Sequence, residues 1–290
     1  MRLGFSHDAL RALGACVALA SCADQDRTRA LEKPEAPAMR TLDAYDAPTA
    51  PITLASVDDL LGRASALVTA VDAIGIDRTF IQNLSAGLAQ VNRNSAAETR
   101  AAASELAVRQ QALTLPGAGY VEVWRTCDGW GAAPVPSPDN GELYMIAGFD
   151  RGEIDPVVWG TLTACRYLMS GREVQLDGTT SDPGDSDVRM FIGEGVEIDD
   201  LPNLEQPVVV ELAARAAVDG REVVTALDFR IDVRTRALEL IVPVDSGHVL
   251  VAIDPTRGGS VRARATNGTF SCEVAARRCT GADGAELSLP

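Results

Sequence analysis

The sequence predicts an α+β protein in which three amino-terminal helices pack on a large curved antiparallel β-sheet or half-barrel. Apolar residues recur at helical spacing between residues 56 and 115, and they alternate with polar residues from residue 116 onward. Two-residue turn signals separate the alternating segments, which is typical of antiparallel hairpins. A sheet with one apolar face must be covered, and the helical region is the obvious cover.

The helical region is expected to contain three helices. The first opens at Ser56-Val57-Asp58-Asp59, which has the spacing of a capping box, and ends at Gly75. A second helix is expected over residues 80–91. An Ala-rich third helix is expected over residues 95–113, where Pro116-Gly117 terminates it. The apolar stripes of these helices could dock on a membrane or a partner, but stripes at this spacing usually form core.

The region after residue 116 is expected to be sheet. Apolar residues alternate with polar or charged residues across residues 208–216, 227–234, 238–244 and 249–253. Asp219-Gly220 is a two-residue hairpin signal between the first two of these segments. The pattern predicts an antiparallel meander with one apolar and one charged face.

Composition and charge limit the partners that this chain can have. Hydrophobic residues make up 46% of the chain, which is enough for a buried core, although only 4% is aromatic. There are 26 basic and 41 acidic residues, giving a net charge of −15. Because so acidic a surface repels nucleic acid and anionic lipid head groups, we expect no nucleic-acid partner and no membrane contact except through an anchor.

The first residues have the pattern of a bacterial export signal. Arg2 and Arg11 frame a positively charged start, and an apolar run follows over residues 12–20. The run is too short to cross a bilayer, which needs about 20 apolar residues. It ends at Leu19-Ala20-Ser21-Cys22, which resembles the lipobox of bacterial lipoproteins. The resemblance implies removal of residues 1–21 and attachment of lipid, palmitate included, to Cys22.

The same resemblance implies a location. Lipoproteins are held in the cell envelope by their lipid, and Ala23 in place of Asp favours the outer membrane, facing the periplasm. The membrane is then a partner through the lipid anchor. An ordinary secretory signal with a chance cysteine is the alternative, and Leu13-Gly14-Ala15-Cys16 is a second, poorer lipobox candidate.

Residues 22–55 are expected to be the lipidated cysteine and a flexible tether. The segment contains four prolines among charged residues and alanines, and it has no apolar periodicity with which to offset chain entropy. The expected organisation is a signal peptide (1–21), the tether (22–55), a helical cap (56–115) and a sheet region (116–290) that packs with the cap as one domain.

The cysteines indicate an oxidising compartment. Four remain after the lipobox: Cys127, Cys165, Cys272 and Cys279. An even number in an exported chain predicts two disulfide bonds. Three pairings are open, and we favour Cys127–Cys165 with Cys272–Cys279, because the second pair has a spacing that suits the end of a hairpin. A zinc site is the alternative, but tight C-x2-C pairs and adjacent histidines are absent from the sequence.

No catalytic motif is found in the sequence. His248 is the one histidine of the expected mature chain and lies in a predicted turn, where a histidine is usually solvated. The one lysine, Lys33, falls in the expected tether, and there is no Walker loop, G-x-S-x-G or H-E-x-x-H motif. Trp130, beside Cys127, could be a sugar platform, but we expect it to pack against the disulfide. The sequence therefore predicts a non-enzymatic protein without a cofactor.

An acidic loop at residues 177–187 raises the question of a metal. Asp182, Asp185 and Asp187 are weak calcium candidates, because hard cations bind clustered oxygen ligands. The loop lacks the spacing of an EF-hand, and a solvated loop without metal is the expectation.

Two functions are considered, and the first is the one that we predict. It is a binding module for a lipid or other apolar ligand, held between sheet and helices. In element order the chain resembles the half-barrel carriers of the outer-membrane lipoprotein localisation system. The second is a structural or protein-interaction lipoprotein of the cell envelope with a packed interior. Uncovered apolar residues on the concave face of the sheet would favour the binding module. An enzyme of an unrecognised kind is a third alternative.

Overall fold

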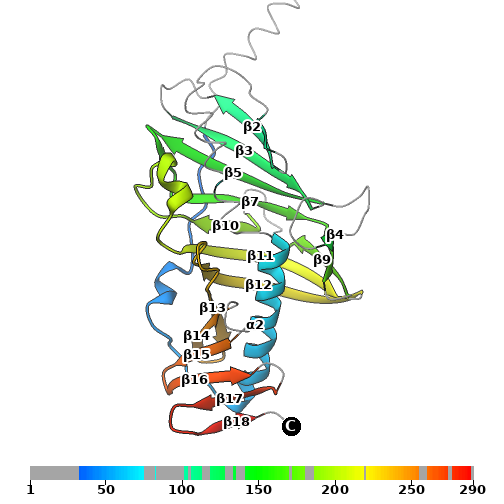
Figure 1. Cartoon of the computed structure of the whole chain (residues 1–290), viewed down its shortest axis with the longest axis vertical. Coiled ribbons are helices and arrows are strands. Elements are labelled where there is room, and N and C mark those ends of the chain that lie inside the picture. The colour runs from blue at the N-terminus through cyan, green and yellow to red at the C-terminus, as the bar shows by residue number, and fades with distance from the viewer. Residues whose placement is uncertain are drawn as a thin grey trace, which may run out of the picture.

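The structure is a computed structural model, and its strands form one sheet (Figure 1). It describes residues 33–74, 82, 101–103, 106–112, 118–127, 133–134, 141–169, 172–179, 186–218, 220–254, 260–273 and 276–288.

The described residues form an eighteen-stranded antiparallel sheet, one long helix and two 3-10 helices. The helices are η1 (Leu42–Tyr45), α2 (Leu54–Ile74) and η3 (Ile198–Asn203). The strands are β1 (Ala101–Ala103), β2 (Leu106–Ala112), β3 (Ala118–Thr126), β4 (Ala133–Pro134), β5 (Glu142–Asp150), β6 (Glu153–Ile154), β7 (Val157–Thr163), β8 (Cys165–Met169), β9 (Arg172–Gly178), β10 (Val188–Phe191), β11 (Val208–Val218), β12 (Arg221–Ile231), β13 (Leu238–Val244), β14 (Gly247–Asp254), β15 (Ser260–Ala265), β16 (Gly268–Glu273), β17 (Arg278–Gly281) and β18 (Glu286–Ser288).

Strand β11 is the point at which the sheet divides. Its first half pairs with β10, from Val209 opposite Phe191 to Leu212 opposite Val188. Its second half pairs with β9, from Ala214 opposite Gly178. Strands β10, β7, β5, β3, β2 and β1 continue the sheet on the first branch, and β9, β8 and β4 form the second. From β11 to β18 the sheet is a plain meander, with each strand beside the next along the chain.

The predicted cap of three amino-terminal helices is wrong. Within the described residues, α2 is the one helix longer than two turns. The expected third helix, residues 95–113, contains strands β1 and β2 instead. Strand β2 pairs with β3 over residues 107–112, and this pairing outweighs the helix propensity of its alanines because it gives the backbone of β3 a partner. The expected second helix, residues 80–91, lies almost wholly outside the described residues. The chain is mostly antiparallel sheet.

Helix α2 begins at Leu54, three residues earlier than the predicted capping box implies. The Ser56 hydroxyl accepts the Thr53 backbone N–H at 2.9 Å, and the Ser56 backbone N–H donates to the Thr53 carbonyl at 3.0 Å. Ser56 therefore lies in the first turn of the helix and helps to cap it, whereas we expected Ser56 itself to be the first capping residue.

The predicted alternation of apolar residues is present, and it builds the core. Leu240 and Val251, on neighbouring strands, are fully buried, as are Val57 and Leu60 of α2 on the same face. Figure 1 shows α2 lying across the strands of the meander. Each such side chain contributes roughly 1.5–3 kcal/mol by leaving water, so the contact between α2 and β13–β14 is a main source of stability.

Residues 33–53, here called the arm, run along the other face of the sheet toward β15 before α2 begins (Figure 1). We expected a flexible tether over residues 22–55. Residues 39–53 instead follow a defined course, with the contacts described below. Residues 22–32 lie outside the described residues, and the remaining domain boundaries stay a prediction.

The packing of α2 on the meander can be tested by truncation. Replacing Leu60 by Ala removes a fully buried side chain, so we expect a loss of about 2–5 kcal/mol in the free energy of unfolding. Urea denaturation followed by circular dichroism measures it. Leu54→Ala is the matched control in the same helix, because Leu54 is 46% exposed. Equal losses in both variants would contradict the packing described.

Candidate functional site beneath the amino-terminal arm

Glu211 is the centre of a charge cluster beneath the arm. It lies in β11 between Val210 and Leu212, which face the core, so its side chain points to the opposite face. Glu211 is nevertheless only 1% exposed. A carboxylate so deeply buried must be partnered to be tolerated, and the arm supplies most of its partners.

The donors to Glu211 come from two elements. The backbone N–H groups of Arg40 and Thr41 donate to Oε1 at 2.5 and 2.9 Å, and the Thr41 hydroxyl lies 3.0 Å from the same oxygen. Oε2 lies 3.4 Å from Nε of Arg40 and 3.5 Å from Nη1 of Arg189, which is in β10. Bonds to a charged group are among the strongest in proteins, so Glu211 is the principal attachment point of the arm.

A second charged row lies beside the first. Arg230 of β12 and Glu239 of β13 are cross-strand neighbours that form an ion pair, and Arg264 of β15 donates to Glu239 at 3.0 Å. The ring of Tyr45 lies against this row, with its centroid 5.2 Å from the Arg230 guanidinium carbon. This geometry is a cation–π contact between the arm and the sheet.

Tyr45 is the largest buried group of the arm, being 3% exposed. Its hydroxyl has no hydrogen-bond partner among the described residues. Burial, aided by the negative charge of Asp228, raises the pKa of the Tyr45 hydroxyl well above its ordinary value. A buried hydroxyl without a partner costs about 1–3 kcal/mol, so part of the gain from docking Tyr45 is cancelled.

Asp228 is the other unfavourable group beneath the arm. It lies opposite Glu211 in the β11–β12 pair, which places two carboxylates side by side. Burial and the charge of Glu211 raise the pKa of Asp228, while Arg40, Arg63 and Arg189 oppose the shift. Like charges on directly opposite residues destabilise a strand pair.

Apolar contacts fill the space between the two charged rows and the arm. Tyr45, Val209, Ile241 and Leu250 form a small buried cluster separate from the main core. Met39, Leu42, Ala44 and Phe191 pack against it. The alternation that sends Leu240 to the core face sends Ile241 to this face, so the sheet has apolar residues on both sides here.

His248 attaches the next part of the arm. Its Nδ1 lies 3.0 Å from Oγ1 of Thr49, and its Nε2 lies 2.9 Å from the Ala44 carbonyl and 3.1 Å from that of Ala47. The backbone N–H groups of Thr49 and Ala50 donate to the His248 carbonyl. We expected His248 to be a solvated turn residue, and that expectation is wrong: the imidazole is a structural attachment point.

Gly247 and Asn267 allow the arm to pass closely. Gly247 has φ +148°, and a Cβ at this position would come within 2.3 Å of Oγ1 of Thr49. Further along, the Asn267 amide accepts the Ile52 N–H at 3.0 Å and donates to the Ile52 carbonyl at 2.9 Å. Asn267 therefore pairs with the chain as a neighbouring backbone would, just before α2 begins.

The predicted disulfide bonds are present. Cys127 pairs with Cys165 with Cα atoms 5.4 Å apart, and Cys272 pairs with Cys279 across β16 and β17 with Cα atoms 4.0 Å apart. These are the pairings that the spacing favoured. Cys22 and Trp130 lie outside the described residues.

The calcium candidates are not brought together within the described part of the chain. Asp182 and Asp185 lie outside it. Asp187 is 6% exposed, and its Oδ2 lies 3.4 Å from the Leu162 backbone nitrogen. The described residues contain no group of three or more acidic, histidine or cysteine side chains that could hold a metal ion.

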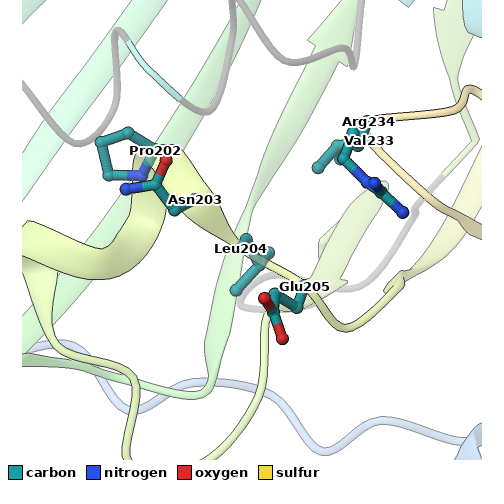
Figure 2. Close-up of a pocket in the computed structure, with 6 residues that line it drawn as sticks. All are labelled: Pro202, Asn203, Leu204, Glu205, Val233 and Arg234. Carbon is teal, nitrogen blue, oxygen red and sulfur yellow. The ribbon is translucent and has the colours of Figure 1, made fainter.

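A polar pocket of about 480 Å³ lies where η3 and the β12–β13 turn approach each other (Figure 2). Leu204 and Val233 are its buried residues, while Glu205 and Arg234 bring opposite charges to it. The remaining lining residues are Pro202 and Asn203. Since its charged groups are on exposed side chains rather than held in place, we assign no ligand to this pocket.

Comparisons of the chain with protein-family models, with curated proteins and with solved structures found no match. Within the described residues, no helix is both long enough and apolar enough to span a membrane.

Asp228 yields a prediction with a definite sign. Folding raises the pKa of the Asp228 carboxyl above its ordinary value of 3.8. The protonated carboxyl therefore stabilises the fold at pH values below 3.8, and this contribution is lost as the pH rises through the pKa of the folded state. Asp228→Asn removes the charged form, so we expect a higher melting temperature than wild type at neutral pH. The difference should vanish as the pH falls toward 3.8. Thermal denaturation across this range measures it, and a variant less stable than wild type at neutral pH would contradict the account.

Proposed function

We propose that this chain is an exported lipoprotein, held at the cell envelope through Cys22, which acts as a protein-interaction module with a packed interior. The observation that carries the proposal is the docking of the arm. The segment that leads from the expected lipid site toward the domain is bonded to Glu211 and His248. A domain joined to its membrane anchor through a docked segment can present its surface to partners in the envelope.

Two further observations support this proposal. The two cysteine pairs agree with an oxidising compartment, in which disulfide bonds persist. The charge of −15 disfavours direct binding of the domain to an anionic bilayer and leaves the lipid as the membrane contact.

The packed interior favours interaction through the surface over storage of an apolar ligand. Among the side chains that the structure describes, the core-facing residues of β14, β15 and β16 are buried, and Leu54 is the one large hydrophobic residue that is exposed. A carrier would need apolar residues left uncovered on the concave face. We further infer a non-enzymatic role, because the sequence contains no Walker loop, G-x-S-x-G or H-E-x-x-H motif.

Lipidation is tested by metabolic labelling with an alkyne analogue of palmitate, followed by membrane fractionation. We expect the wild-type chain to be labelled and to sediment with membranes, because lipid on Cys22 anchors it. Cys22→Ser should be unlabelled and should not sediment. Cys16→Ser is the matched control and should behave as wild type. Labelling of Cys22→Ser, or an unlabelled wild-type chain, would contradict the anchor.

The packed interior is tested by native mass spectrometry of residues 23–290, directed to the periplasm by a cleavable secretory signal in place of residues 1–22. We expect the mass of the processed chain, less four hydrogens for its two disulfides, with nothing bound. A discrete added mass that organic solvent removes, identified as lipid, would contradict the packed interior and restore the lipid-binding alternative.

A further inference from the structure

We propose that arm residues 33–50 form a releasable strap, which detaches from the sheet as a unit while Ile52 stays bound to Asn267. In the docked state the strap covers the second face of the sheet. In the released state it lengthens the connection to the membrane anchor and uncovers the apolar surface formed by Phe191, Val209, Ile241 and Leu250. The change in length rests on the proposed lipid anchor at Cys22, whereas docking and release do not.

The strap is attached at a few separate points. Lys33 pairs with Asp155 at 2.7 Å, and Arg40 and Thr41 bind Glu211. His248 binds the strap through Thr49, through the carbonyls of Ala44 and Ala47, and through its own carbonyl. At its end, Ala50 is buried in the main core and accepts the Thr266 N–H, so release must also free this residue. Within the described residues the arm contributes no strand to the sheet, and its one regular element is the four-residue η1. Detachment therefore breaks side-chain contacts and a few backbone bonds, but no strand ladder of the sheet.

Two unfavourable features lie under the strap and lower its net docking energy. The Tyr45 hydroxyl is buried without a partner in the described residues, and Asp228 is held, partly buried, beside Glu211. Release relieves both, because water can then hydrate the hydroxyl and screen the two carboxylates. Both features reduce the free energy of docking, and segments of low local stability open before the rest of a protein unfolds.

Release has a geometric consequence for an anchored chain. An extended chain spans at most about 3.3–3.6 Å per residue. From Cys22 to Lys33 the connection reaches about 35–40 Å, and from Cys22 to Pro51 it reaches about 95–105 Å. The strap thus stores roughly 60 Å of additional reach. Docked and released states would place the sheet, and the surface beneath the strap, at different distances from the membrane.

The test is hydrogen–deuterium exchange of the full chain carrying Cys22→Ser, measured by mass spectrometry on peptides covering residues 40–50 and strands β13–β14. We expect the Arg40, Thr41, Thr49 and Ala50 amides to be protected, but to exchange at least about 100-fold faster than the β13–β14 amides, as in a local opening. Equal rates in the two regions would overturn the proposal, since the strap would then open only with global unfolding. Complete absence of protection in the strap would also overturn it, because no docked state would exist.

Two substitutions on neighbouring residues sharpen the test. Glu211→Gln weakens the charged bonds to the arm and should raise exchange in the strap by about 10- to 100-fold, with β13–β14 unchanged. Asp228→Asn is its matched partner in the same cross-strand pair and should slow exchange in the strap. Equal acceleration of strap and sheet in Glu211→Gln would indicate global destabilisation and overturn the proposal.

Thr49→Val supplies a second variant if Glu211→Gln fails to fold. It removes the hydroxyl bonded to His248 at the other attachment point, and it should also accelerate exchange in the strap alone. Because all these measurements use the unlipidated chain, failure of the lipid anchor leaves them unchanged. Failure of strap release likewise leaves the labelling result unchanged.

Discussion

A single-layered sheet has two faces, and apolar side chains on either face must be kept from water. Here one chain segment packs on both faces of the meander. The arm follows one face, the chain turns at Ile52 against Asn267, and α2 returns along the other face. The main core beneath α2 and the small cluster around Tyr45 both depend on this turn. The clasp formed by arm and helix is therefore the constraint on which the rest of the described architecture depends.

The two halves of the clasp differ in their chemistry. Helix α2 is held by Val57, Leu60 and Ala64 in the main core, a contact that is strong and does not depend on orientation of polar groups. The arm is held by directional bonds to Glu211 and His248, around a smaller apolar cluster. Directional bonds specify where the arm lies, while leaving its net affinity for the sheet sensitive to small changes in charge and hydration. This difference is why a functional role is more readily assigned to the arm than to the helix.

Several features were readable from residue order because they are local. Alternation such as Leu238, Leu240 and Val242 predicts which side chains of a strand share a face, and all three are buried. The disulfide partners Cys272 and Cys279 are close in sequence, so a hairpin brings them together. In contrast, the helix propensity of residues 106–112 predicted a helix. These residues form a strand because they pair with the edge of β3, and the local sequence carries no information about that pairing.

By itself, the sequence determined the alternation of the sheet, the acidic charge and the even number of cysteines that predicts two disulfides, because each depends on composition or on neighbours along the chain. Only the tertiary structure decided that one long helix, rather than three, packs on the described meander, and that the proline-containing arm is docked. The roles of Glu211 and His248 could not be predicted from the sequence, in which they are only an acidic residue in an apolar strand and a histidine in a predicted turn. Their roles arise because Arg40 and Thr49, about 170 and 200 residues away, reach them in the fold. Such long-range pairings are set by the whole packing of the chain, which local pattern does not encode.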